Sequence, residues 1–352
     1  MPTGGQRARI RPTGQPSRIR APGAGGAGSV PNRTGRIEPA RSHPGESMEF
    51  GIHLPQLGRQ ATRDGLRHLA VRADELGFHS GWVSDHVAWP TSIESKYPYT
   101  DDGSFPAGVD MAWLDPMGTL FFVAAVTERL KLGVTVLILG YRWPILTAKA
   151  WASLDVLSEG RAIVGIGVGW MREEFEVLGM PFDHRGARAD EQLDLYQACF
   201  TQDRPRFDGR YYQIPEIGFA PKPVQQPMPI WVGGDTEPAF RRTVKYGSAF
   251  HAAFQPIDEV AAGWARIREL ATEAGRDPDE ITLSIRLYLD PEGSMAPAKS
   301  VAGSSEQMAE TLGRWRDIGV GHVLLDPVVR GGIDGRVEAM EHLMGEVRPR
   351  LE

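Results

Sequence analysis

The 352-residue chain has a single cysteine, Cys199, which excludes an internal disulfide bond and any metal site built from several cysteines. We expect Cys199 to pack in the core. No apolar run approaches the roughly 20 residues of a membrane-spanning helix, so we expect a soluble, cytoplasmic protein. A phosphate-loop motif, a G-x-S-x-G elbow and paired His or Cys residues at ligand spacing are also missing. We therefore expect no metal site.

Acidic and apolar residues are scarce at the N-terminal end. Residues 1–47 contain eight Arg, no Lys and two Glu, a net charge of +6, and because the whole chain carries −6 the remainder carries −12. We expect this Arg-, Gly- and Pro-rich segment to be disordered, and we interpret it as an over-called start or an idle extension before Met48. The folded domain then spans residues 48–352. Its acidic charge argues against a nucleic-acid partner.

From Met48 onward, short apolar strand-like runs alternate with helix-like segments. The strand-like runs cover residues 50–54, 80–84, 130–139, 162–169, 230–232, 248–253, 281–289 and 322–325. The helix-like segments cover residues 62–76, 116–127, 144–157, 183–200, 237–246, 257–274 and 305–318, with a last one from 337. This strict alternation predicts an α/β fold of the (β/α)₈ TIM-barrel type. A doubly wound sheet, the alternative, needs only about five or six units and leaves the C-terminal part without a role.

In such a barrel the chemistry lies at the carboxyl ends of the strands. Asp85 and His86 stand out there, because two titratable residues end a buried strand without continuing its apolar pattern. His53 also lies at a strand end, where both a core role and a functional role fit. The other strand-end candidates are Gln56, Trp89, Thr135, Val136, Arg142, Trp170, Asp235 and Thr236.

Glycines occupy every second position near the end of one strand, at Gly165, Gly167 and Gly169. Missing side chains on one face let a bulky group approach the backbone, so this strand end is predicted to hold a flat ligand. The spacing of these glycines inside the strand argues against a dinucleotide-binding loop. Gly233 and Gly234 instead stand between a strand and a helix start, where exposed N–H groups bind phosphate.

Several segments carry a resemblance to a known family, among them MEFGIHLPQLG, GFHSGWVSDHVAWP, RAIVGIGVGWMREEFEVLGMPFDHRG and PIWVGGDTEPAFRRTVKYG. From Met48 to about residue 325 the chain resembles the bacterial luciferase-like superfamily, specifically its coenzyme F420-dependent (deazaflavin) oxidoreductases. The resemblance implies a (β/α)₈ barrel with an insertion after strand four, which holds a flavin or 5-deazaflavin across the strand ends. It also implies a homodimer.

The resemblance further implies roles for particular residues. His86 would lie beside the carbon that transfers the hydride. A non-prolyl cis peptide bond between Thr135 and Val136 would lie behind the cofactor ring. The residues expected to bind the cofactor are Asp85, Thr135, Val136, Val168 and Gly169, together with Glu173 at the polar chain and Gly233 and Gly234 at the phosphate.

One position departs from the family pattern. The sugar-phosphate dehydrogenases of this branch place a glutamate general acid where this chain has Trp170, which puts sugar-phosphate activity in doubt. Glu173 and Glu174 lie one helical turn further on, and either could replace that acid, although we interpret Glu174 as structural. His86 is then the expected proton-transfer residue.

The loop at residues 89–113 is longer than most structureless connections and rich in aromatic residues, which suggests a lid over the site. We expect Trp89, Trp113 and Trp170 to line a pocket for an apolar or aromatic small-molecule substrate. The expected reaction is hydride transfer between coenzyme F420 and an unsaturated or carbonyl compound. The alternatives are an FMN-dependent monooxygenase, which uses O₂ and a separate flavin reductase, and a non-catalytic cofactor-binding barrel.

Overall fold

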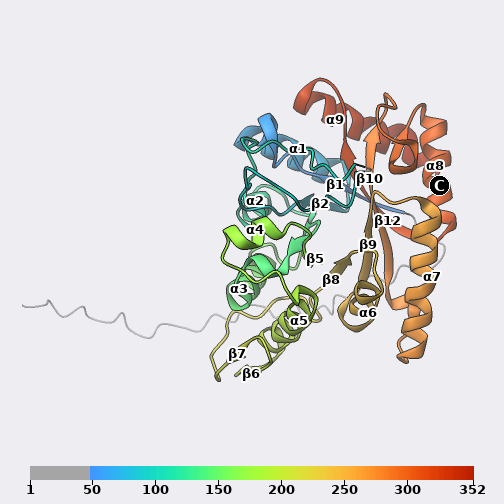
Figure 1. Cartoon of the computed structure of the whole chain (residues 1–352). Helices are drawn as coiled ribbons and strands as arrows, with labels where there is room; N and C mark the ends of the chain where they lie inside the picture. Colours follow the sequence, from blue (N-terminus) through green and yellow to red (C-terminus); the bar gives the residue numbers. More distant parts are fainter. Residues whose placement is uncertain (1–47, 101) are drawn as a thin grey trace, which may run out of the picture. The chain divides into compact units, whose positions relative to one another are not determined.

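The computed structural model describes residues 48–100 and 102–352 (Figure 1). The extension expected at residues 1–47 lies outside the described residues, so its predicted disorder stays a prediction.

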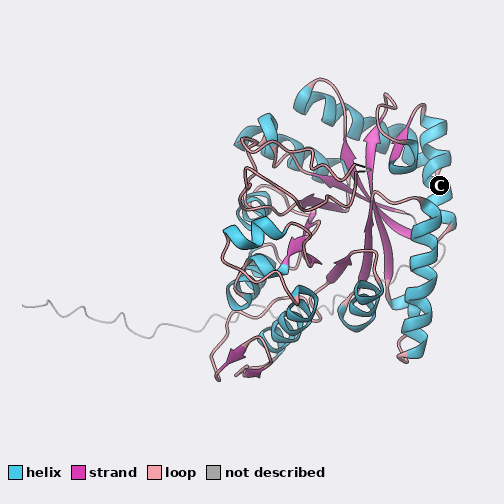
Figure 2. Cartoon of the chain, in the orientation of Figure 1, coloured by secondary structure: helices cyan, strands magenta, loops and turns pink. Residues whose placement is uncertain are grey.

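Parallel strands close into a barrel, with helices on the outside (Figure 2). The barrel strands are β1 (Glu49–His53), β2 (Ser80–Val83), β3 (Lys131–Val134), β5 (Ala162–Gly167), β8 (Ile230–Gly233), β9 (Ala249–Ala253), β10 (Thr282–Asp290) and β12 (Val320–Pro327). Each pairs with the next in this order, and β12 closes the ring on β1, with Glu49 opposite His322 and Ile52 opposite Leu325. The predicted (β/α)₈ barrel is confirmed.

Several helices begin at side-chain caps. The side chain of Thr62 accepts a hydrogen bond from the Gly65 amide at 3.1 Å, and Ser304 forms a capping box with Gln307. The helices packed around the barrel are α1 (Arg63–Leu76), α2 (Pro116–Ala124), α3 (Pro144–Leu157), α5 (Arg185–Thr201), α6 (Glu237–Tyr246), α7 (Ile257–Glu273), α8 (Ser305–Asp317) and α9 (Gly332–His342). The start predicted for the last helix, residue 337, is wrong, because Gly332 already begins α9 at a φ of 70°.

The connection between β5 and β8 is the insertion expected after the fourth barrel strand. It contains the short helix α4 (Arg172–Val177), the longer α5, and a small antiparallel hairpin of β6 (Phe207–Asp208) and β7 (Gln213–Ile214). Figure 1 shows the hairpin beside α5, away from the barrel strands. Helix α4 bears on function, because it follows directly from a strand end.

The third predicted strand, residues 130–139, is not continuous. β3 ends at Val134, and the peptide bond between Thr135 and Val136 is cis, as the family resemblance implied. The chain then resumes as β4 (Leu137–Ile138), which pairs with β5. The bulge therefore interrupts the strand where the cofactor ring was expected.

The barrel interior contains histidines whose hydrogen bonds are met inside the core. His322 bonds through its two ring nitrogens to the hydroxyls of Ser80 and Ser284, both at 2.9 Å. His53 is buried against Ser84 at 2.9 Å, and burial lowers its pKa to about 3. His53 is therefore a neutral core histidine. Cys199 is fully buried, which confirms its expected place in the core.

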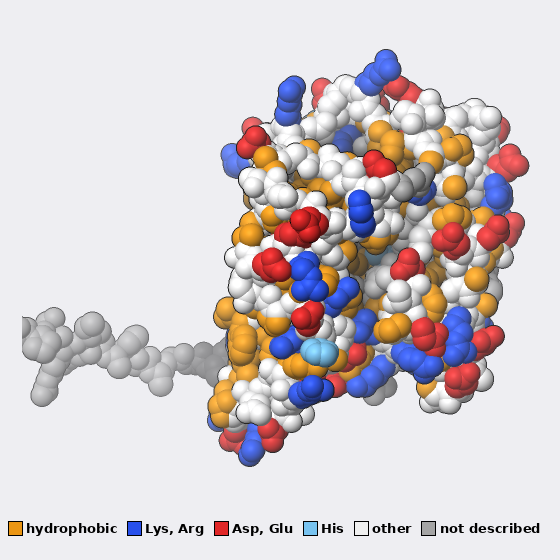
Figure 3. All heavy atoms as spheres, in the orientation of Figure 1, with side chains coloured by type: hydrophobic (Ala, Val, Ile, Leu, Met, Phe, Trp, Pro, Cys, Tyr) orange, Lys and Arg blue, Asp and Glu red, His pale blue; other side chains and the backbone are white. Residues whose placement is uncertain are grey.

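Acidic and basic side chains are interspersed over the face drawn in Figure 3, with apolar side chains between them. Within the described residues, no helix combines the length and the apolar character needed to cross a bilayer.

Candidate functional site

The predicted cofactor-binding residues follow β2, β3, β5 and β8, which are consecutive strands of the barrel. Residues far apart in the sequence are thereby placed along one arc of the barrel mouth. The remaining strands, β9, β10, β12 and β1, form the other arc.

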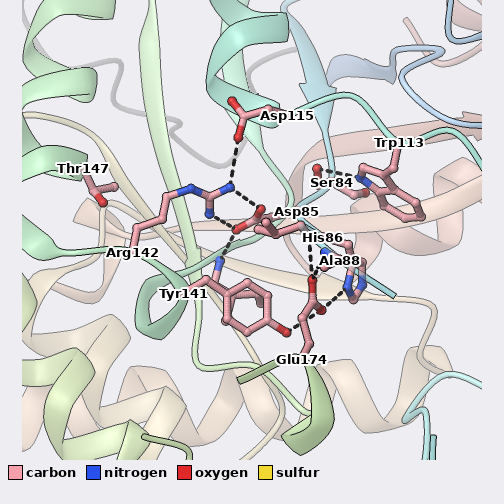
Figure 4. Close-up of polar contacts among 12 residues, drawn as sticks. Ser84, Asp85, His86, Ala88, Trp113, Asp115, Tyr141, Arg142, Thr147 and Glu174 are labelled. Carbon is pink, nitrogen blue, oxygen red and sulfur yellow. Dashed lines mark hydrogen bonds and ion pairs between the residues drawn. The ribbon is translucent and has the colours of Figure 1, made fainter. Parts of the chain in front are cut away.

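His86 follows β2, and the carboxylate of Glu174 on α4 fixes its ring (Figure 4). Nδ1 of His86 lies 2.6 Å from Oε2 of Glu174, which is fully buried. Because an ionised carboxylate only accepts hydrogen bonds, Nδ1 is the protonated nitrogen of this pair. The other ring nitrogen, Nε2, is left for a ligand.

The carboxylate of Glu174 accepts further hydrogen bonds, besides the one from His86. Tyr141 donates its hydroxyl to Oε2 at 2.8 Å, and the amides of Val87 and Ala88 donate to Oε1 at 2.6 and 3.2 Å (Figure 4). Burial alone raises the pKa of Glu174, but the bonds from His86, Val87 and Tyr141 outweigh it and lower the pKa. We name Glu174, His86, Tyr141, Val87 and Ala88 the Glu174 network.

Asp85 is also buried, and its carboxylate is engaged within the protein. Arg142 holds it in a forked pair at 2.7 and 2.8 Å, and the Ile138 amide donates to it at 2.9 Å. Arg142 also reaches Asp115, the N-cap of α2, at 3.1 Å (Figure 4). Asp85 thus ties the end of β2 to β4 and α2, and its expected contact with the cofactor stays a prediction.

Aromatic rings from the lid and from the end of β5 surround His86. The ring centroids of Trp89, Trp113 and Phe105 lie 4.5, 5.0 and 5.3 Å from that of His86. Trp170 lies 6.3 Å from it and packs on Phe105 at 5.5 Å. The three tryptophans predicted to line the substrate pocket are brought together around the predicted catalytic histidine.

Glu173, the neighbour of Glu174, holds the lid. Its Oε1 accepts hydrogen bonds from the amides of Glu94 and Ser95 at 2.7 and 2.9 Å. Burial alone raises the pKa of Glu173, but a hydrogen bond from the Ser95 hydroxyl, together with the backbone amides, outweighs it and lowers the pKa to about 2. Its Oε2 is buried and has no hydrogen-bond partner among the described residues.

The alternating glycines of β5 make room for the chain itself. A methyl group at Gly167 would collide with Val136 of the cis bulge, and one at Gly165 would collide with the carbonyl of Val134. A methyl group at Gly169, where φ is 81°, would lie 2.8 Å from Ile138. The close approach predicted here is confirmed, and the Val134–Ile138 segment makes it; the flat ligand expected at this strand end stays a prediction.

The remaining predicted residues lie at two strand ends. Val168 is partly buried against the core, directly after β5. β8 ends at Gly233, and Gly234 adopts a φ of 117° before Thr236 caps α6 without a side-chain hydrogen bond. Pro238 in the first turn of α6 has no N–H, and the Ala239 and Phe240 amides donate to the Thr236 carbonyl at 2.8 and 3.0 Å, so the phosphate contact expected at Gly233 and Gly234 stays a prediction.

The sequence interpretation missed two features. It treated Glu174 as structural, because the partner His86 lies 88 residues away in the sequence. It also passed over Arg286 and Asp326, an ion pair between β10 and β12 with Nη2 to Oδ2 at 2.6 Å. The available signal was a charged residue inside an otherwise apolar strand and another at the end of the next one.

Comparison with known proteins agrees with this fold. A protein of Mycobacterium tuberculosis that has no assigned function is 36% identical over 60% of this chain and 74% of its own. The F420-dependent glucose-6-phosphate dehydrogenase of Kineococcus radiotolerans is 32% identical over 66% of each chain. Two solved structures cover 87% of this chain: an F420-dependent secondary alcohol dehydrogenase (TM-score 0.70, 17% identity, its whole length) and the monooxygenase RslO1 of Streptomyces bottropensis (TM-score 0.69, 20% identity, its whole length). The luciferase-like monooxygenase family model matches residues 48–302. The chain therefore belongs to the luciferase-like monooxygenase family, as the resemblance of its strand-end motifs predicted.

Proposed function

We propose that the chain is a coenzyme F420-dependent oxidoreductase that transfers a hydride between the deazaflavin ring and a small unsaturated or carbonyl substrate. The observation that carries this proposal is His86, which the buried Glu174 holds at the strand ends among aromatic rings. The F420-dependent relatives support the choice of cofactor.

The residues at the ends of β2, β3, β5 and β8 fit a bound deazaflavin. The unpartnered Oε2 of Glu173 suits a hydroxyl of the cofactor's polar chain, since a buried carboxylate oxygen needs a donor. Gly233 and Gly234, whose missing side chains leave the backbone accessible between β8 and α6, are the residues that would receive its phosphate. Val136 and Val168 offer apolar surface for the ring. The bound deazaflavin supplies the hydride chemistry, while the protein supplies binding and orientation.

His86 moves the proton in this proposal. The Nδ1–H of His86 donates a hydrogen bond to Glu174, so Nε2 is the nitrogen that would meet the substrate. In its doubly protonated form, the imidazole of His86 would donate a proton from Nε2 to a substrate that receives the hydride. In the reverse direction, the neutral ring accepts the proton of an alcohol at the same atom. The Glu174 network keeps the ring in one orientation and thereby reduces the ordering needed during reaction.

The wall around His86 determines which substrates fit. Trp170 stands where the sugar-phosphate branch has a carboxylic acid. Its ring centroid lies 5.2 Å from that of Tyr97 and 5.5 Å from that of Phe105. The aromatic wall favours an apolar or aromatic group over a sugar. We therefore place the substrate among enones, imines, aldehydes and ketones with an apolar body.

The test is oxidation of reduced F420 by a panel of these compounds, with purified full-chain protein and His86→Ala in parallel. We expect turnover with at least one compound, and a much lower rate in the variant. A parallel reaction supplies reduced FMN and O₂. Product formed only with FMN and O₂ would favour the monooxygenase, and cofactor binding without turnover of any compound would favour the non-catalytic barrel.

A further inference from the structure

A second buried group of charges lies on the other arc of the mouth, on β10, β12 and α9. Arg286 pairs with Asp326 at 2.6 Å, and their side chains are only 13% and 17% exposed. Nη1 of Arg286 also lies 3.4 Å from the hydroxyl of Ser84 and 3.4 Å from the carbonyl of Thr135. This arginine therefore reaches from β10 to the cis bulge and to the residue before Asp85.

The group carries excess positive charge. Burial alone raises the pKa of Asp326, but His53, which is protonated in the acidic range where Asp326 titrates, lowers it together with Arg286 and Arg336 to about 2, so Asp326 is ionised at neutral pH. His53 is neutral there, since burial lowers its pKa to about 3. Two arginines thus face one carboxylate. We name Arg286, Arg336 and Asp326 the mouth cluster.

Two donors of the mouth cluster are unused. Nε of Arg286 and Nη1 of Arg336 are buried and have no hydrogen-bond partner among the described residues. A buried donor without a partner is costly, and native proteins rarely leave one unless a ligand or water completes it. Guanidinium groups with free N–H donors and uncompensated charge are suited to planar oxyanions, above all carboxylates.

The surroundings indicate what the oxyanion is attached to. The Arg286 guanidinium lies 5.0 Å from the ring centroid of Phe254, which stacks on Tyr288 at 4.2 Å. Tyr99 of the lid lies 6.1 Å from Phe254. Phe254 holds a φ of 52°, a conformation that is uncommon for a bulky residue and often marks a functional site. A flat, unsaturated body fits beside these rings.

We infer that the mouth cluster binds a carboxylate of the substrate, so that the substrate is an unsaturated or carbonyl compound that bears a carboxylate. This inference rests on the proposed function for the reaction, but its charge and donor arguments do not depend on the cofactor. The substrate is the more suitable source of the oxyanion, because the cofactor's phosphate is expected at Gly233 and Gly234 on β8, in the arc that the mouth cluster does not belong to.

The test uses full-chain protein without cofactor, titrated at constant ionic strength with benzoate and with its neutral analogue benzamide, and followed by tryptophan fluorescence. We expect benzoate to bind about tenfold or more tightly than benzamide. Arg286→Gln should remove most of this preference and Arg336→Gln part of it. Arg330→Gln is the matched control, because Arg330 is 90% exposed and pairs with Glu292 at the surface, so the preference should persist.

A second variant covers the case in which Arg286→Gln fails to fold. Asp326→Asn removes the one carboxylate of the cluster, so it should tighten benzoate binding while leaving benzamide unchanged. Equal affinities for the two probes in the wild-type protein would overturn the inference, as would an unchanged preference in Arg286→Gln.

Saturating the protein with F420 separates the substrate from the cofactor as the source of the oxyanion. Benzoate that still binds in the presence of F420 supports a substrate site, whereas benzoate displaced by F420 overturns it in favour of a cofactor anion. A protein that prefers benzoate but never binds F420 would contradict the proposed function and keep the anion site. A protein that turns over F420 without any preference for benzoate would contradict the anion site and support the proposed function.

Discussion

The His86–Glu174 and Arg286–Asp326 pairs are both buried at the barrel mouth, and both have a closest contact of 2.6 Å. They differ in what surrounds them. Both oxygens of Glu174 are engaged by protein donors, whereas two buried N–H groups of the mouth cluster have no partner in the part of the chain that the structure describes. A network whose groups are all satisfied holds a side chain in place, and one with open donors is completed by a ligand. The distance within a pair therefore says less about its role than the remaining partners do.

Replacing His86 should have the largest effect on activity. His86→Ala removes the proposed proton-transfer group, so turnover of reduced F420 should fall about 10²- to 10⁴-fold while the cofactor still binds. The check is steady-state turnover together with cofactor affinity measured on the same preparation. His68→Ala, an exposed position on α1, is the control and should keep wild-type activity. Unchanged turnover in His86→Ala would remove the proton-transfer assignment.

Replacing Glu174 should have the largest effect on stability, because this one carboxylate accepts the hydrogen bonds of all the donors in the Glu174 network. Glu174→Ala leaves a histidine, a tyrosine and two amides without their acceptor, and we expect the free energy of unfolding to fall by about 3–5 kcal/mol. Urea denaturation measures it, with the exposed Glu176→Ala on the same helix as the control. If both variants lose the same stability, the Glu174 network is not what holds this region.

The pH dependence of Glu174 has a definite sign. Its pKa is lowered in the folded protein, so the carboxylate stabilises the fold above its unfolded value of 4.5 and loses that contribution as the pH falls through the folded value. The stability difference between the wild-type protein and Glu174→Gln should therefore shrink below that pH. A difference that grows on acidification would contradict the assignment of an ionised Glu174.

A methyl group at Gly167 should have a moderate effect. It would collide with Val136, and overpacking of this kind costs about 1–3 kcal/mol. Gly313→Ala on α8 is the control, since nothing lies within 4 Å of the added methyl group and the change should be neutral or stabilising by about 0.4–1 kcal/mol. Thermal unfolding of the two variants measures the contrast. Equal melting temperatures would restore the interpretation that a ligand, not the chain, needs these glycines.

Replacing Glu173 should have the smallest effect, confined to the lid. Glu173→Gln weakens the acceptor for two lid amides, so hydrogen exchange at Glu94 and Ser95 should speed up without global destabilisation. The pKa of Glu173 is lowered to about 2 in the folded protein. In the wild-type protein, protection of the lid amides from exchange should therefore hold above pH 4.5 and decline between pH 4.5 and about pH 2. Exchange at Leu132 in β3 is the internal control. Equal exchange rates of the lid amides in both proteins would show that Glu173 does not hold the lid.

Sequence periodicity was sufficient for the barrel, because each unit is a local pattern of apolar residues, and caps such as Thr62 and Ser304 mark some of the helix starts. It was not sufficient for the break at Thr135–Val136, since the 130–139 segment is apolar throughout and only the family resemblance indicated a cis bond. The alternating glycines correctly predicted a close approach, but they could not reveal that Val134 at the end of β3 and Val136 of the cis bulge make it. Glu174 and Arg286 were undervalued because their partners come from distant segments.

The central claim is tested most directly by titrating the full-chain protein side by side with F420 and FMN. Tryptophan fluorescence reports binding, because three of the nine tryptophans, Trp89, Trp113 and Trp170, lie around the site. We predict that F420 binds about tenfold or more tightly than FMN and retains its affinity in His86→Ala. Tighter binding of FMN, or no binding of either cofactor, would contradict the proposed hydride-transfer function.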